Sequence, residues 1–532
     1  MTRPTATTRL LCNGSTEARG RKSGRAFRLD YRPEAKPDRN MNVSLPAFES
    51  RVLAISDRVL DLLEIAAYVF CADRCIRRGA RDDVEYHTWS RTLEFRIRVR
   101  DAVFWRRAEV LETLGDALRF MSGDRRYEFH FEPGHTTPPS TLFSQAGTVL
   151  RPTGPVAVSL FSGGLDSLSG AVERLDAGDH VCLVSHRSQP GTIHTQTQLA
   201  TALQRLFPGN VTPYGFDCTL RGIAAPEETQ RTRAFLYTSI GFAVSATFGE
   251  SRLYVFENGV TSVNFRRRED QGLARTSRTT HPKTMRLLER LFSLIRDATF
   301  TIEQPFLAHT KPDILRKLSH APIRNLVDST VSCSQTRKNL GMAMQCGTCF
   351  QCVDRRMAAF AADLDEVDHP GLYACDFLTE PLAGQAKTTF VDYLRQALDF
   401  RRVNIDHFYE QHLPELADVT DGMPHSTEAQ VVERMHSLVR RHGEGIASAI
   451  RTIVAKHDDP SKARVPGSAL DLIAQQEHLK APVERLVATI MARVEPAIQH
   501  MFAKGRLPAD ENDFNQKLAA AIEEARKKRE AA

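Results

Sequence analysis

Apolar and polar positions change their period in a regular way between residues 156 and 302. Short apolar runs of strand length alternate with longer segments in which apolar residues recur every three or four positions. The expected strands cover residues 156–161, 180–185, 211–217, 253–256 and 299–302. The expected helices begin at residue 165 and cover residues 195–207, 234–248 and 282–295. This alternation predicts an α/β fold built on a doubly wound parallel sheet.

A different pattern precedes this region. Residues 93–100 and 127–131 alternate apolar and polar side chains strictly, which predicts two strands that each have one buried and one solvent-facing side. Helical spacing of apolar residues marks residues 60–70 and 108–120. We therefore expect a small α+β accessory domain over residues 41–133, which serves interaction or substrate positioning.

The first forty residues carry the net charge of the chain. Residues 1–40 hold ten Lys and Arg against four Asp and Glu, a surplus of six that equals the +6 of the whole chain. Residues 41–532 therefore sum to zero, and a nucleic acid is not expected as the direct substrate. Residues 1–40 lack periodicity, which predicts a disordered basic tail, and Met41 is an alternative start of the chain. Proline-rich residues 134–155 are expected to be a linker before the α/β domain of residues 156–375.

Residues 376–532 are expected to form a helical extension without a chemical motif. Apolar residues recur at helical spacing over residues 391–413, 431–453 and 470–502. The extension either packs on the α/β domain or docks a partner protein. The sequence holds no run of about 18 apolar residues, the length that a membrane span needs. The N-terminus lacks the apolar core of a signal peptide, so we expect a cytoplasmic protein without membrane association.

Residues 162–167, Ser-Gly-Gly-Leu-Asp-Ser, join the first expected strand of the α/β domain to its first helix. Gly163 and Gly164 let the backbone approach a ligand closely, and the hydroxyls of Ser162 and Ser167 flank them. Together with the amides at the helix start, these groups suit an anion such as pyrophosphate. The pattern is neither a Walker A loop nor a Rossmann Gly-x-Gly-x-x-Gly. A plain glycine turn is the alternative.

The pattern Ser-Gly-Gly-x-Asp-Ser resembles the PP-loop of ATP pyrophosphatases. The resemblance implies that ATP is cleaved between its α and β phosphates, with release of pyrophosphate. The expected ATP-binding residues are Ser162, Gly163, Gly164, Leu165, Asp166 and Ser167, and Ser185 and His186, which end the second strand where adenosine would sit. Asp166 is expected to coordinate Mg²⁺, because a carboxylate beside phosphate is repulsive unless a cation or the helix amides offset it.

Other polar residues end strands or begin helices of the same domain. Glu257 and Asn258 follow the strand at 253–256, where ligands of such sheets bind, although Asn-Gly is also a favourable turn. Arg231 and Arg233 open the preceding helix, where arginine gains nothing from the helix dipole. They are expected to face a phosphate or a substrate carboxylate, with a solvated helix face as an equal alternative.

His281 and Lys311 lie in segments that follow later strands of the sheet. Lys311 is expected to stabilise the leaving pyrophosphate as a point charge. The expected catalytic residues are Asp166, Ser167, Arg231 and Lys311. The expected substrate-binding residues are Arg233, Glu257, Asn258 and His281.

Four cysteines form the second strong motif. Twelve residues separate Cys333 from Cys346, and Cys349 and Cys352 follow at two-residue gaps. Four thiolates complete a closed tetrahedral Zn²⁺ site, and an iron–sulfur cluster is disfavoured because no cysteine follows three residues later. With every position filled by sulfur, the metal is expected to hold structure. Cys71 and Cys75 share one helix face but have no nearby partner pair, so they are expected to be free cysteines.

The two motifs together resemble QueC, the 7-cyano-7-deazaguanine synthase family. The glycine motif is followed about 170 residues later by Cys...Cys-Gly-x-Cys-x-x-Cys-x-x-Arg, which ends at Arg355, and residues 231–236 resemble the family's Arg-Asn-x-x-Phe-Leu segment. The resemblance covers residues 154–365 approximately. It implies ATP-dependent adenylation of 7-carboxy-7-deazaguanine or a related deazapurine, followed by attack of ammonia to give an amide and then a nitrile.

Three features depart from housekeeping QueC: the greater length, the twelve-residue cysteine gap, and residues 257–264, Glu-Asn-Gly-Val-Thr-Ser-Val-Asn. They resemble the QueC-like proteins of bacterial anti-phage systems, the QatC group and the QueC-like component of some CBASS operons. Such a relative stops at the amide or conjugates the activated deazapurine to an amine of a partner protein. A PP-loop tRNA-modifying enzyme and a non-catalytic nucleotide-binding scaffold are the remaining alternatives.

Overall fold

A computed structural model describes residues 7–16, 26–32, 35, 39–45, 55–79, 89–134, 140–141, 154–227, 229–267, 277–335, 343–458 and 463–475. The chain forms two compact units. The first unit comprises Met1–Asp376 and Gly384–Ala455, and the second comprises Phe377–Ala383 and Lys456–Ala532. The first unit has an α/β architecture with two largely parallel sheets, which confirms the predicted fold class at that level.

The larger sheet of the first unit has seven strands in the order β11-β10-β7-β8-β9-β3-β6. Their bounds are β3 Met41–Leu45, β6 Ser140–Thr141, β7 Val156–Leu160, β8 His180–His186, β9 Val211–Leu220, β10 Arg252–Tyr254 and β11 Thr301–Glu303. All neighbours run parallel except β3, which is antiparallel to β9, so the sheet is mixed. The five strands predicted between residues 156 and 302 are all present.

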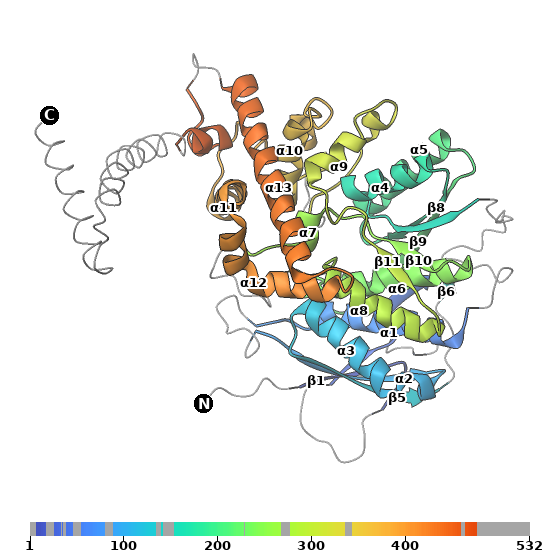
Figure 1. Ribbon diagram of the computed structural model, residues 1–532. Helices are drawn as coiled ribbons and strands as arrows, with labels where there is room; N and C mark the ends of the chain where they lie inside the picture. The colour runs from blue at the N-terminus through green and yellow to red at the C-terminus, as the bar shows by residue number, and fades with distance from the viewer. Residues whose placement is uncertain are drawn as a thin grey trace, which may run out of the picture. The chain divides into compact units, whose positions relative to one another are not determined.

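Helices cover both faces of this sheet (Figure 1). On one face lie α4 Leu165–Asp176, α5 Pro190–Leu206 and α9 Lys311–Lys317, with α10 Phe350–Ala361 packed on α9. On the other face lie α1 Asp57–Cys75, α6 Arg233–Thr247 and α8 Pro282–Arg296. Because β7 and β8 are buried between these layers, their sequences are apolar at nearly every position instead of alternating.

The second sheet has four parallel strands in the order β2-β1-β4-β5, with α2 Ala102–Trp105 and α3 Ala108–Ser122 packed against it. Its strands are β1 Thr8–Cys12, β2 Ala26–Leu29, β4 Thr92–Val99 and β5 Arg126–Pro133. The strands predicted at 93–100 and 127–131 are therefore confirmed. The prediction of a disordered tail over residues 1–40 is wrong for the part of that range that the structure describes, because β1 pairs with both β2 and β4.

Two short strands in this region were missed for a physical reason. β1 and β2 have only five and four residues, too few to reveal a period of two, and basic and glycine-rich segments surround them. Leu10 and Cys12 are nevertheless fully buried. The segment therefore contributes to the core.

One continuous core joins the two sheets. Buried side chains from β1, α1, β4, α3, α6, α8 and β11 form a single cluster, because α1 contacts both β2 and β9 while α3 packs on α8. The predicted accessory domain, linker and α/β domain therefore belong to one compact unit. Within the predicted linker, Ser140–Thr141 adds the edge strand β6 to the larger sheet.

The helices after the α/β region are α11 Gly384–Arg402, α12 Ile405–Gly422 and α13 Glu428–His457, and the short α7 Gly259–Val263 contacts their core (Figure 1). The predicted extension of residues 376–532 is divided, since Gly384–Ala455 belongs to the first unit. The helix predicted at 470–502 lies outside the described residues beyond position 475. Within the described part of the chain, no helix is both long and apolar enough to cross a membrane.

Candidate functional site

The topological switch point of the larger sheet lies at its carboxyl edge between β7 and β10, and we call this place the crevice. After β7 the chain adds β8 and β9 on one side and returns to place β10 and β11 on the other. The loops that follow β7 and β10 therefore diverge at this point, which is where ligands bind in open α/β sheets. Two predicted residues meet there, because Asp166 in the first turn of α4 is hydrogen-bonded to Asn258 at the start of α7.

The glycine loop, residues 162–167, connects β7 to α4 at this switch point. Gly163 has a φ of +83°, and an added Cβ would lie 3.1 Å from Thr195 Cγ2, so the position favours glycine on two counts. Gly164 precedes the first turn of α4, and no side chain caps that helix. The hydroxyls of Ser162 and Ser167 lie 3.2 Å apart beside the helix start. The positive end of α4 and two hydroxyl groups therefore lie together at the switch point.

Asp166 is buried and saturated by donors of the protein. Its Oδ1 accepts from Lys311 Nζ at 3.0 Å, and its Oδ2 accepts from the amide and the side chain of Asn258 at 3.1 and 2.8 Å. Burial raises the pKa of Asp166, but the Lys311 charge and the hydrogen bonds outweigh burial and hold that pKa below its usual value. The carboxylate is therefore ionised in this arrangement.

Lys311 joins this carboxylate to a second one that the sequence did not reveal. Lys311 begins α9, and its Nζ also lies 3.8 Å from Asp354 Oδ2 on α10. The Tyr393 hydroxyl donates to Asp354 Oδ1 at 3.0 Å. Burial lowers the pKa of Lys311, but the facing carboxylates raise it above its ordinary value. No motif identifies Tyr393, whereas Asp354 shares a helix with the cysteine motif and could have been suspected.

Glu257 completes a group of three acids around one lysine. Burial and the neighbouring Asp166 carboxylate raise the pKa of Glu257 well above its usual value. A raised pKa favours the protonated acid, which can hydrogen-bond Asp166 instead of repelling it. Three acidic side chains and one lysine therefore meet beside the glycine loop.

Gln196 on α5 fastens the glycine loop to the neighbouring strand. Its side-chain amide donates to the carbonyl of Ser162 at 3.4 Å and to the carbonyl of His186 at 3.3 Å. The sequence analysis missed this residue, since a single glutamine in an amphipathic helix carries no signal. Ser185 acts similarly, because its hydroxyl donates to the carbonyl of Phe161 at 2.9 Å.

The His186 ring belongs to the core and not to the crevice. It stacks on Phe216 with centroids 4.9 Å apart and meets the edges of Phe70 and Tyr237. Burial and the Arg233 charge lower its pKa to about 3, so the ring is neutral. The backbone of His186 ends β8, and its carbonyl accepts from the Gln196 side chain at 3.3 Å and from the Ser188 amide at 3.0 Å.

Two other predicted residues, Arg231 and His281, lie among aromatic and charged side chains. Arg231 lies 5.1 Å above the Trp89 ring, and burial followed by the Arg78 charge lowers its pKa to about 10. Its surroundings are the buried acids Asp73 and Asp124, which bind Arg78 and Arg91.

His281 caps α8 by accepting from the amide of Lys283, and its ring packs on Phe120. Burial lowers the pKa of His281 to about 3, with smaller effects from Arg278 and Lys283. The exposed Arg233 lies over the Tyr237 ring at 5.6 Å. The contacts of these side chains therefore place Arg231 beside Trp89 and His281 beside Phe120.

The four cysteines of the second motif converge. The sulfurs of Cys333, Cys346, Cys349 and Cys352 all lie within 4.8 Å of one another, and three of the pairs measure 3.4, 3.8 and 4.0 Å. A tetrahedron with Zn–S bonds of about 2.3 Å separates its sulfurs by about 3.8 Å. The cluster can therefore hold a metal such as zinc. Cys71 and Cys218, by contrast, form a buried pair of free thiols 3.8 Å apart.

Backbone geometry preorganises the cysteine cluster. Gly347 has a φ of +80°, and an added Cβ would lie 1.9 Å from the carbonyl oxygen of Cys375. The amides of Gln335 and Cys349 donate to the sulfurs of Cys333 and Cys346 at 3.3 Å each. Hydrogen bonds with neighbouring thiols lower the pKa of Cys346 and Cys349 and raise that of Cys333 and Cys352.

The cysteine cluster and the glycine loop are directly connected. The amide of Val331, two residues before Cys333, donates to the carbonyl of Gly163 at 3.0 Å. Arg355, fully buried on α10, binds the Thr330 carbonyl at 2.9 Å and Asp368 at 2.7 Å. The segment that carries the first cysteine is therefore held against the loop from both sides.

Comparison with protein-family models found no match, and comparison with curated proteins found no significant match. The case for function consequently depends on the residues of the crevice.

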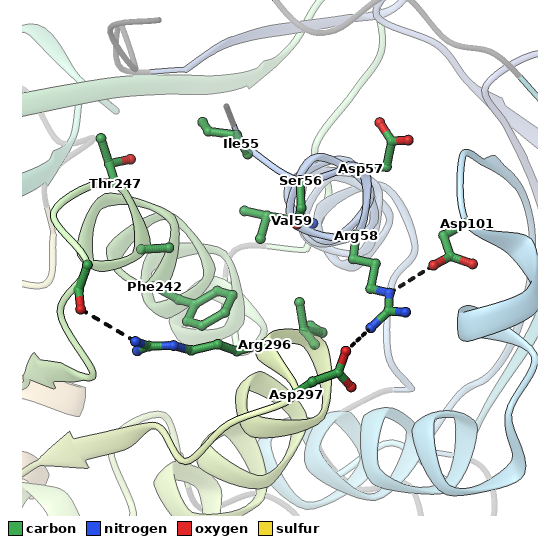
Figure 2. Close-up of a pocket in the computed structure, with 13 residues that line it drawn as sticks. Ile55, Ser56, Asp57, Arg58, Val59, Asp101, Phe242, Thr247, Arg296 and Asp297 are labelled. Carbon is green, nitrogen blue, oxygen red and sulfur yellow. Dashed lines mark hydrogen bonds and ion pairs between the residues drawn. The ribbon is translucent and has the colours of Figure 1, made fainter. Parts of the chain in front are cut away.

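A separate cavity of about 620 Å³ lies elsewhere in the first unit (Figure 2). It is bounded by the start of α1 and the ends of α6 and α8, and Arg58 bridges Asp101 and Asp297 at its rim at 2.8 and 2.7 Å. Because α6 runs directly into β10, its end lies at the amino edge of the sheet. The cavity is therefore opposite the glycine loop and takes no part in that site.

Proposed function

We propose that this protein is a PP-loop ATP pyrophosphatase of the QueC type, which adenylates a carboxylate and transfers it to a nitrogen nucleophile. The observation that carries the proposal is the glycine loop at the switch point of the sheet, at the uncapped start of α4 and beside buried Asp166 and Lys311. The convergent cysteines support the same family, since the resemblance depends on both motifs. The proposed substrate is 7-carboxy-7-deazaguanine or a related deazapurine.

The roles of the residues follow from their chemistry. Amides and hydroxyls of Ser162–Ser167 bind the ATP phosphates at the positive end of α4. Mg²⁺, if bound, would supply positive charge to the phosphates, and Asp166 would hold it in exchange for one of its present hydrogen-bond donors. Lys311 stays charged beside Asp166 and limits the repulsion between that carboxylate and the phosphates.

The reaction needs no covalent nucleophile from the protein. An oxygen of the substrate carboxylate attacks the α phosphorus, and the bond to the bridging oxygen of pyrophosphate breaks. The nitrogen nucleophile then attacks the acyl carbon, AMP leaves with the electron pair of the carbon–oxygen bond, and the nitrogen loses a proton. Positioning and electrostatic stabilisation supply most of the rate enhancement in such a site.

Product analysis tests this proposal. Purified protein with ATP, Mg²⁺, ammonia and 7-carboxy-7-deazaguanine is expected to form AMP and pyrophosphate, and to form neither when the acid is omitted. Asp166→Asn is expected to abolish AMP formation. The control is Asp179→Asn, which also removes an ion-paired carboxylate, from Arg174, but at the amino edge of the sheet. Formation of ADP, or full activity of Asp166→Asn, would contradict the proposal.

The cysteine cluster is proposed to hold one structural Zn²⁺ ion. Metal analysis of the purified chain is expected to give one zinc per molecule, and Cys349→Ser to lose it. Thiols must lose their protons to bind the metal, so the affinity is expected to fall as the pH is lowered below neutrality. A titration with a chromophoric zinc chelator at several pH values measures this dependence, and a pH-independent affinity would contradict thiolate ligation.

We also propose that the protein acts in a bacterial anti-phage defence system. The length of the chain and residues 257–264 support the anti-phage branch of the family, in which the acceptor is ammonia or an amine of a partner protein. Mass spectrometry of the product separates these acceptors, because a partner protein gains the mass of the deazapurine acyl group, whereas ammonia gives a free amide or nitrile.

A further inference from the structure

Donors of the protein surround the Asp166 carboxylate. Its Oδ1 accepts from Lys311 Nζ, and its Oδ2 accepts from both the amide and the side chain of Asn258. Glu257 adds a further side-chain hydrogen bond. Because a carboxylate has about four lone-pair sites, a Mg²⁺ ion gains an oxygen of Asp166 only when one of these donors moves away. The packing around each donor indicates which one moves.

Asn258 is firmly anchored at the start of α7. Its side-chain oxygen accepts from the Thr261 amide at 2.9 Å, and its side-chain nitrogen donates to the Thr261 hydroxyl at 2.9 Å. Glu257 adjoins Asn258 in the chain and accepts from the same nitrogen at 3.4 Å. Moving either residue away from Asp166 would therefore disturb the cap of α7 and break several hydrogen bonds.

Lys311, by contrast, has a second acid within reach. Its Nζ lies 3.0 Å from Asp166 Oδ1 and 3.8 Å from Asp354 Oδ2. An approach to Asp354 of only 0.8 Å, 3.8 minus 3.0, gives a contact as short as the present one, and a lysine side chain is flexible enough for it. The three side chains are 5 to 7 % exposed, so the ammonium group needs a carboxylate partner at every stage.

Other helices orient the Asp354 carboxylate. Tyr393 on α11 donates to its Oδ1 at 3.0 Å, while its Oδ2 is the oxygen nearest to Lys311. Arg267 also attracts this carboxylate, which can accept from several donors at once. The Tyr393 ring in turn packs on His442 of α13, with centroids 5.9 Å apart. Helices α11 and α13 therefore hold the second acid beside Lys311 in place.

We propose that Asp354 is a positioning residue, which takes Lys311 over from Asp166 when a divalent cation binds there. The inference rests on the proposed function, in which Asp166 holds Mg²⁺. Lys311 keeps a carboxylate partner throughout, and its release frees a lone pair of Asp166 for the metal. α11 thereby becomes part of the site, since Tyr393 orients the carboxylate that receives Lys311.

Binding of Mn²⁺ to the full chain, supplied with zinc but without nucleotide, tests the inference by electron paramagnetic resonance. Asp354→Asn is expected to weaken Mn²⁺ binding about tenfold or more, since Lys311 then stays on Asp166 and competes with the metal. Tyr393→Phe changes no charge and is expected to weaken it about threefold, because Asp354 loses a hydrogen bond that orients it.

The matched control is Asp313→Asn, the same charge change on the helix of Lys311. Asp313 binds Arg316 and Arg441 at 3.0 and 2.8 Å, so its loss is expected to leave the Mn²⁺ affinity unchanged. The zinc content of every variant is measured as well, since Asp354 shares α10 with the cysteine motif. Weakened Mn²⁺ binding at wild-type zinc content supports the inference.

A double variant separates transfer of Lys311 from simple attraction between Asp354 and the metal. In a Lys311→Met chain, Asp354→Asn is expected to have no further effect on Mn²⁺ binding, and equal weakening in both backgrounds would overturn the inference. If the Lys311→Met chain does not fold, Tyr393→Phe decides, since unchanged Mn²⁺ affinity in that variant would also overturn it. So would absence of Mn²⁺ binding by the wild type. The assay needs neither ATP nor turnover, so failure to form AMP contradicts the proposed function alone.

Discussion

At the scale of single residues, Lys311 decides whether the buried charges beneath the glycine loop are tolerated. Its side chain is 5 % exposed and faces Asp166 and Asp354, which are also buried. Breaking a buried ion pair from one side leaves an uncompensated charge and usually costs more than the pair contributes. Lys311 is therefore a residue on which both the fold and the proposed chemistry depend.

Replacement of Lys311 by methionine is expected to lower the free energy of unfolding by about 3–5 kcal/mol, because two carboxylates lose their counter-charge. Urea denaturation followed by circular dichroism measures the change. Lys317→Met on the same helix is the control, since Lys317 pairs with Glu173 at 2.8 Å but both side chains are more than a third exposed. The control is expected to cost about 1 kcal/mol or less. Equal losses in the two variants would show that burial of Lys311 is unimportant.

His281 gives a prediction about pH. Its pKa is about 3 in the folded chain, whereas an unfolded histidine titrates near 6.5. Between these values the unfolded chain binds a proton that the folded chain does not, so the stabilisation is complete above pH 6.5 and is lost as the pH falls. Between pH 6.5 and 5 the loss from this residue is about 2 kcal/mol.

The variant His281→Asn retains a helix-capping side chain and removes the titrating group. Its stability is expected to depend less on pH between 5 and 7 than that of the wild type, while His425→Asn, at an exposed position, is expected to change nothing. Denaturant midpoints at several pH values measure the slopes. An unchanged slope in His281→Asn would contradict the assignment.

At the scale of elements, the glycine loop combines backbone strain with close packing. Gly163→Ala is expected to destabilise the chain by about 1–2 kcal/mol, since alanine disfavours positive φ. It is also expected to weaken nucleotide binding, because the new methyl group would lie too close to Thr195 and displace the loop. Gly209→Ala provides the comparison, with a φ of +82° and nothing within 4 Å of its Cβ. It is expected to show the stability loss alone, as measured by denaturation and by titration with a non-hydrolysable ATP analogue.

The elements that the sequence predicts well are those with a strong local pattern. β7, α4 and β8 appear where apolar periodicity places them, and Cys333 meets the other cysteines because their spacing is short. Contacts between distant segments carry no such signal. Tyr393 reaches Asp354 across helices of different regions, and Arg231 lies over the Trp89 ring, contacts that only tertiary packing determines.

At the scale of the whole molecule, the described residues 7–16 and 26–32 are part of the folded structure. β1 is an interior strand of the four-stranded sheet, and Leu10 is completely buried. A chain that starts at Met41 is therefore expected to lose solubility or to unfold at a clearly lower temperature than the full chain. Comparison of soluble yield and thermal midpoint tests this. A truncated chain as stable as the full chain would contradict this expectation and support the prediction that residues 1–40 are a disordered tail.

The helical layer between the sheets serves both of them. α1 contacts β2 on one side and β9 on the other, while α3 on the smaller sheet packs on α8 of the larger one. Because these helices bury side chains of both sheets in one core, moving residues 1–133 into another protein would expose apolar surface on both parts. Laboratory recombination is therefore better attempted at surface loops than at the boundary between the sheets.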